Sequence, residues 1–143
     1  MKPELNGPYW ALRLGIGLTA FLAGLDKFAH LLADWDMYLN PLALQLIPLG
    51  ADTFMQVVGV VEVAVGIAIL SGWTRLGAYL ASAWLLGIAL NLVTMGRFFD
   101  IAVRDVGLSI AAFTLARLAE VRDPIVAREG ARHADPGAIR TRA

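Results

Sequence analysis

Charged residues are rare along most of the chain and divide it into four long apolar segments. Each segment is close to the roughly 20 residues that an α-helix needs to cross a bilayer core about 30 Å thick. A β-barrel would instead show short segments of alternating polarity. The pattern therefore predicts an all-α protein whose residues 1–121 form a four-helix transmembrane bundle. The predicted spans cover about residues 9–32, 53–71, 75–95 and 100–120.

The connections between the segments differ in length and polarity. Two of them are short, whereas residues 33–52 form a long and unusually apolar loop. Within this loop Asn40 can cap a helix, Pro41 suits its first position and Pro48 would end it. We expect a short helix here, lying at the outer interface of the membrane. The polar residues 122–143 predict a disordered cytoplasmic tail.

Arginine and lysine residues give the expected orientation. They are more numerous on the side that receives both chain ends, which places both termini in the cytoplasm and makes the chain a multi-pass plasma-membrane protein. Arg13 interrupts the first apolar segment and no clear A-x-A motif follows it, so we expect no cleaved signal peptide. Aromatic residues fall near the ends of the spans, as in an interfacial belt: Trp10, Trp35, Tyr38, Trp73, Phe98 and Phe99.

Composition supports a lipid environment and excludes several classes of site. Hydrophobic residues make up 58% of the chain and charged residues 17%, against about 45–50% and about 25% in soluble domains. The 12 basic and 12 acidic residues leave no net charge to attract nucleic acid. Because the chain has no cysteine, it can form no disulfide, iron–sulfur cluster or c-type haem attachment. With only two histidines, we expect neither a metal site nor a haem bound by this chain alone.

The first segment gathers small and charged residues on one helical face. Arg13, Gly17, Ala20, Gly24 and Lys27 recur at spacings of three and four residues. Small residues let helices approach closely in lipid, and charged residues avoid the lipid-facing side. This face should therefore turn into the bundle.

Glu62 lies near the centre of the second segment, on one face with Gly59 and Gly66. A charge at that depth costs about 2.5–3.5 kcal/mol on the insertion scale. We therefore expect Glu62 to have a partner or to be protonated.

Helix direction places most of the remaining polar residues at one level. We expect an ion pair between Lys27 and Asp105, with Glu62 bridged by Asn91 or a water, or kept neutral. Arg13 should lie alone near the cytoplasmic end and extend to the interface, and His30 can pair with Asp26. We expect a polar cluster in the outer half of the bundle, with Glu62 just below it. Its members are Lys27, Gln56, Asn91, Arg104 and Asp105.

This cluster has two interpretations. Ionisable groups inside a membrane indicate a site for a small polar ligand, a proton or a quinone head group. Buried polar groups can equally serve to fix how helices pack. The residues alone leave both open.

Short motifs in three segments resemble the DoxX-like family of membrane proteins, over about residues 10–120. The long first loop also resembles related methylamine-utilisation maturation proteins. The motifs are Leu12-Arg13-Leu-Gly-Ile-Gly, Ala23-Gly24-Leu-Asp-Lys27-Phe, Val61-Glu62-Val-Ala-Val-Gly66-Ile-Ala-Ile-Leu70-Ser-Gly72 and Arg104-Asp105-Val-Gly-Leu-Ser109.

The resemblance implies a four-helix membrane bundle in which Arg13, Lys27, Glu62 and Asp105 occupy recurrent polar positions without an assigned catalytic role. Some relatives are subunits of a thiosulfate:quinone oxidoreductase, and others are associated with secreted redox enzymes or act as assembly factors. We therefore expect a small membrane subunit of a quinone- or sulfur-linked redox system, with a protein partner. The alternative is a non-catalytic scaffold or maturation factor. Whether the chain is an enzyme stays open, and its glycine-lined faces would permit a homo-oligomer.

Overall fold

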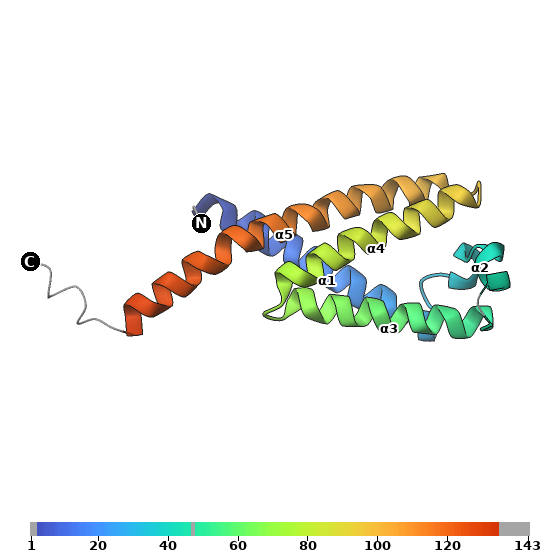
Figure 1. The fold of residues 1–143 in the computed structure, drawn as a ribbon, viewed down its shortest axis with the longest axis horizontal. Coiled ribbons are helices and arrows are strands. Elements are labelled where there is room, and N and C mark those ends of the chain that lie inside the picture. The colour runs from blue at the N-terminus through green and yellow to red at the C-terminus, as the bar shows by residue number, and fades with distance from the viewer. Residues whose placement is uncertain (1–2, 47, 135–143) are drawn as a thin grey trace, which may run out of the picture.

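The computed structural model describes residues 3–46 and 48–134, without the side chains of Ala43 and of residues 124–134. The described residues form helices joined by turns and loops (Figure 1), as the all-α prediction requires. The four predicted segments are confirmed as the helices α1, α3, α4 and α5. In chain order the elements are η1 (Pro3–Leu5), α1 (Asn6–Ala29), η2 (Trp35–Tyr38), α2 (Pro41–Leu46), α3 (Ala51–Leu70), α4 (Thr74–Thr94) and α5 (Phe99–Ala134).

Two of these helices, α3 and α4, are long and apolar enough to cross a membrane by length and composition. That α1 and α5 also span it stays a prediction. The helices are arranged as two closely packed pairs, α1 with α3 and α4 with α5. The α4–α5 pair diverges from α3 toward the end of the molecule that carries α2 (Figure 1).

Glycine residues allow the close packing of α1 on α3. A Cβ atom at Gly24 would lie 2.7 Å from the backbone oxygen of Gly59, and one at Gly59 would lie 2.7 Å from the oxygen of Gly24. A Cβ at Gly66 would lie 2.7 Å from the nitrogen of Phe21. These distances are too short for any larger residue, so the predicted inward orientation of this face is confirmed.

The apolar core has two parts. One includes Ile16, Ile69 and Leu115 near the α3–α4 turn, and the other contains Leu92 and Ala102 near the opposite end. Buried polar residues occupy the levels between them, and we call these residues the polar layer. They are Asp26, Lys27, Glu62, Ser82, Asp105 and Ser109.

The loop after α1 packs against the diverging end of α4 and α5. The Tyr38 ring meets Phe98 edge-on, with centroids 4.9 Å apart, and the Tyr38 carbonyl accepts a hydrogen bond of 2.9 Å from Asn91 Nδ2. The predicted short helix is present as α2. Its cap is also confirmed, since Asn40 Oδ1 accepts from the backbone N–H of Leu42 at 3.0 Å.

The end of α1 differs from the expectation for His30. His30 closes the helix in a left-handed conformation, with φ 53°. Its backbone nitrogen donates to the Asp26 carbonyl at 2.6 Å. The Asp26 carboxylate instead accepts from the backbone nitrogens of Leu31 and Leu32, both at 2.9 Å. Asp26 therefore fixes the chain as it leaves α1.

The predicted disordered tail begins as helix. α5 continues to Ala134, and Arg122 holds this extension against the start of α1. Its Nη1 donates to Asn6 Oδ1 at 3.0 Å, and its guanidinium carbon lies 4.4 Å from the centre of the Tyr9 ring. Residues 135–143 lie outside the described part of the chain.

Candidate functional site

The centre of the polar layer is an ion pair between Lys27 of α1 and Glu62 of α3. Lys27 Nζ lies 2.5 Å from Glu62 Oε2, and the two side chains are only 4% and 10% exposed. The glycine contact described above makes this pair possible, because a Cβ at Gly59 would already lie 3.0 Å from the Cβ of Lys27. The pair answers the requirement that Glu62 have a partner.

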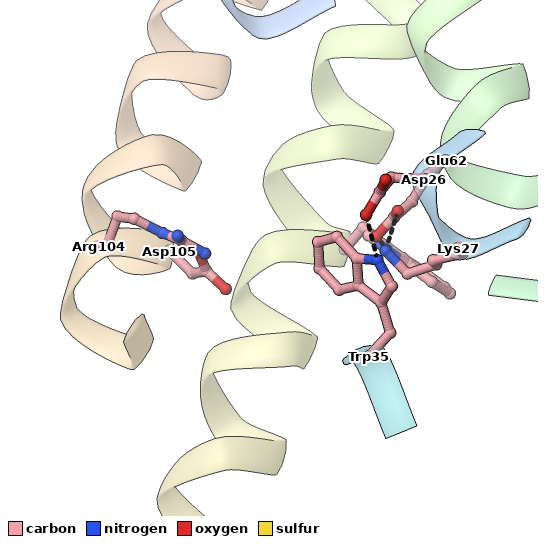
Figure 2. A network of polar contacts seen from close by, with 7 residues as sticks. Asp26, Lys27, Trp35, Glu62, Arg104 and Asp105 are labelled. Atoms are coloured by element: carbon pink, nitrogen blue, oxygen red, sulfur yellow. Dashed lines mark hydrogen bonds and ion pairs between the residues drawn. The ribbon is translucent and has the colours of Figure 1, made fainter. Parts of the chain in front are cut away.

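Two tryptophan residues border this pair. Trp84 Nε1 of α4 lies 3.4 Å from Glu62 Oε1, a long hydrogen bond. Lys27 Nζ lies 3.8 Å from the centroid of the Trp35 ring, within cation–π range. The Trp35 Nε1 donates to Asp26 Oδ2 at 2.8 Å (Figure 2). The indole rings therefore place a cation, a carboxylate and flat aromatic surfaces in one small region.

Neither tryptophan is among the residues that the sequence predicts for the cluster. The position of Trp35 near the end of a predicted span indicates an interfacial belt, which says nothing of its side-chain contacts. The tryptophan side chain itself is a signal for such contacts. Its indole N–H can donate to a buried carboxylate, and its ring can face an ammonium group.

The predicted ion pair between Lys27 and Asp105 is wrong. Asp105 pairs with its neighbour Arg104, whose Nε and Nη2 lie 3.1 Å and 3.0 Å from Asp105 Oδ1. Figure 2 shows this pair on α5, apart from the pair formed by Lys27 and Glu62. The physical reason is helix pairing, because α1 packs mainly on α3 and its lysine reaches the acid there.

Asn91 and Gln56 lie outside the centre of the layer. Asn91 Nδ2 donates to the Tyr38 carbonyl and contacts Met95 Sδ at 3.8 Å, so the predicted bridge from Asn91 to Glu62 is wrong. Gln56 Nε2 donates to Asp52 Oδ2 at 3.1 Å in an exposed contact on α3. Both amides serve local structure near the end that carries the long loop.

Arg13 lies at the opposite end of the bundle, as expected, but it does not extend freely toward the interface. Its Nε donates to the Ile69 carbonyl at 3.0 Å. Its Nη2 donates to the carbonyls of Leu70, at 2.8 Å, and Ser71. Because α3 ends here, no following helical turn donates backbone N–H groups to these carbonyls, and a cation is favourable beside them. Arg13 thus caps α3.

A pair of hydroxyl groups joins α4 to α5 within the polar layer. Ser82 Oγ and Ser109 Oγ are 3.0 Å apart, and Ser109 Oγ donates to the Ser82 carbonyl at 2.8 Å. This contact satisfies both hydroxyls in a buried position, as the packing of polar groups between helices requires.

The polar layer and its partners contain more acidic than basic groups. Asp26, Glu62 and Asp105 face the two cations Lys27 and Arg104, and the Arg104 side chain is 62% exposed. Among the side chains that the structure describes, the Asp26 carboxylate has no cationic partner, and it accepts hydrogen bonds from Leu31, Leu32 and Trp35 instead. The layer therefore combines N–H donors and carboxylate acceptors with aromatic faces. Among the described residues, no group of three His, Asp or Glu side chains could hold a metal ion.

Comparison with known proteins places the chain in a family. The DoxX family model matches residues 9–97, more than half of the chain. The match begins within the first turn of α1, includes Lys27 and Glu62, and ends before α5 begins. Comparison with curated proteins and with solved structures found no match. On the strength of the family match, with two helices apolar enough to cross a bilayer, the chain belongs to the DoxX family of membrane proteins.

Proposed function

We propose that the chain is a small membrane subunit of a redox complex, in which the ion pair of Lys27 and Glu62 forms the binding site for a quinone head group. The observation that carries the proposal is the placement of this buried pair against the indole groups of Trp35 and Trp84. An ionisable pair inside a membrane protein marks a functional position. A quinone is a planar ring with carbonyl acceptors, so it needs donors and flat neighbours.

The donors of such a site are present. The Lys27 ammonium has three N–H groups, of which one points to Glu62 and the charge as a whole faces Trp35. The contact from Trp84 Nε1 to Glu62 is 3.4 Å long, beyond the usual 2.7–3.2 Å of an N–H···O bond. If this N–H turned from the carboxylate to a quinone carbonyl, the protein would therefore lose only a weak hydrogen bond.

The reaction supported by such a site is the exchange between quinone and quinol. Reducing one quinone takes two electrons and two protons. Lys27 and Glu62 can exchange protons with the ring oxygens, and the electrons come from a partner oxidoreductase in the complex, such as one that oxidises a sulfur compound. The chain then binds and orients the quinone at the membrane, while the partner supplies the reducing equivalents.

Quinone titration of the purified protein tests this function. In mild detergent, a short-chain quinone should quench tryptophan fluorescence to saturation. Trp84→Phe keeps an aromatic ring, a smaller one, but removes the N–H, and should weaken binding about tenfold, as expected for one hydrogen bond near a charge. Glu62→Gln should weaken it further.

The matched control is Asp52→Asn, which removes an exposed carboxylate from the same helix, α3. It should bind quinone like the unchanged protein. If no variant alters the titration, or Glu62→Gln lowers only thermal stability, the polar layer is structural. The alternative of a non-catalytic scaffold or assembly factor would then hold.

A further inference from the structure

A hollow lies at the end of the bundle opposite the long loop. It has a volume of about 330 Å³ and is partly open to the outside. Its lining residues come from the first half of α1, from the α3–α4 turn with the start of α4, and from α5. Figure 1 shows these elements at the end of the bundle opposite α2. The lining of the hollow includes Tyr9, Arg13, Ser71, Gly72, Thr74 and Arg122.

Two guanidinium groups line this hollow, and both lie close to the Trp10 ring. Their carbons lie 4.8 Å, for Arg13, and 5.1 Å, for Arg122, from the centroid of Trp10. Two cations that line one small hollow repel one another, and an anion bound between them would offset this repulsion. The fold thus maintains two cations together, by the α3 cap at Arg13 and by the bond from Arg122 to Asn6.

Both arginines keep donors for a ligand. A guanidinium has five N–H groups. Arg13 uses Nε and Nη2 on backbone carbonyls, and Arg122 uses Nη1 on Asn6. Neither arginine forms an ion pair among the described side chains. The one acidic residue among those described at the hollow is Asp123, so its lining is positive overall.

We propose that this hollow binds the phosphate group of an anionic molecule, with Arg13 and Arg122 as its two cationic ligands. Arginine presents paired N–H groups that match phosphate oxygens. Trp10 and Trp73 are 38% and 69% exposed near the same end, as residues at the headgroup level of a membrane are. The phosphate can belong to an anionic phospholipid or to a soluble phosphate ester, and both present the same oxygens.

Binding measurements in a phosphate-free detergent distinguish these two sources. In the first arm, phosphatidylglycerol or phosphatidylcholine is added to the protein in dodecyl maltoside, and retained lipid is counted by native mass spectrometry. In the second arm, inorganic phosphate and glycerol 3-phosphate are titrated calorimetrically. Preferential retention of phosphatidylglycerol assigns the hollow to a lipid, and saturable binding of either soluble anion assigns it to a soluble phosphate.

Three variants connect either result to the hollow. Arg122→Gln should weaken the observed binding at least about tenfold, because charge-assisted hydrogen bonds are lost. Gly72→Glu should do the same by placing a carboxylate at the lining, where a Cβ meets open space. Arg75→Gln, which removes an exposed charge at the same end but not at the hollow, should change binding less than about twofold.

The outcomes decide the proposal even if Arg122→Gln folds poorly, since Gly72→Glu leaves both arginines in place. Absence of binding in both arms would overturn it. Equal losses for Arg75→Gln and for the two hollow variants would also overturn it, because the attraction would then come from the net charge of this end.

Discussion

Replacing Lys27 by methionine would leave the Glu62 carboxylate buried without its cation. The Glu62 side chain is 10% exposed, so water cannot replace the ammonium. The remaining hydrogen bond from Trp84 is 3.4 Å long and offers little compensation. Removing one partner of a buried ion pair costs about 3–5 kcal/mol, and we expect Lys27→Met to lower the free energy of unfolding by that amount.

The double variant Lys27→Met/Glu62→Leu distinguishes the loss of the ion pair from the cost of burying one charge without its partner. With both charges gone, no uncompensated group is buried, and well-packed apolar replacements of a buried pair are often neutral or stabilising. The double variant should therefore be more stable than Lys27→Met alone, and denaturant-induced unfolding in mild detergent measures the difference. Arg97→Met, at an exposed position, is the control and should shift stability by less than about 0.5 kcal/mol.

Two results would refute the ion pair as described. One is a Lys27→Met protein within about 1 kcal/mol of the unchanged protein, which is too small a loss for an unpaired buried charge. The other is a double variant whose destabilisation equals the sum of the two single changes, since independent sites add and coupled ones do not.

Three further substitutions test other contacts of the fold. Gly59→Ala places a Cβ 2.7 Å from the oxygen of Gly24 and should cost about 1–3 kcal/mol of unfolding free energy as overpacking; Gly87→Ala, where a Cβ meets open space, should be neutral or stabilising. Trp35→Phe keeps an aromatic ring, a smaller one, but loses the hydrogen bond to the Asp26 carboxylate, and should cost about 1 kcal/mol and speed amide hydrogen exchange in the loop that follows α1. Arg13→Gln removes guanidinium bonds from carbonyls at the end of α3 and should lower the unfolding temperature, whereas Arg13→Lys, which keeps the charge, should recover part of the loss.

Periodicity predicted the helices and the inward face of α1 because both depend on spacing along one helix. Gly24 and Lys27 lie on the same side of any helix with 3.6 residues per turn. The short helix α2 was predicted for a similarly local reason, because Asn40 and Pro41 are capping signals within the segment itself.

Spacing along one helix does not show which helices are neighbours. Lys27, Glu62 and Asp105 are all buried in the polar layer, whereas their depth in a membrane stays a prediction. Depth does not determine which acid the lysine reaches, however, since that depends on the pairing of α1 with α3. The role of Trp35 depends on how the long loop folds back, and the helical start of the tail depends on contacts of Arg122 that periodicity does not contain.

The most direct test of the proposed quinone site is photo-crosslinking with a quinone that carries a photoreactive group on its ring. After irradiation in nanodiscs, peptide mass spectrometry locates the labelled residues. We predict labels on α1, α3 and α4 around Lys27, Glu62 and Trp84, which excess unlabelled quinone should suppress. Labels that are spread over exposed positions on the outside of the bundle, such as Leu22 and Val60, which are 54% and 59% exposed, and that competitor does not suppress would contradict the account.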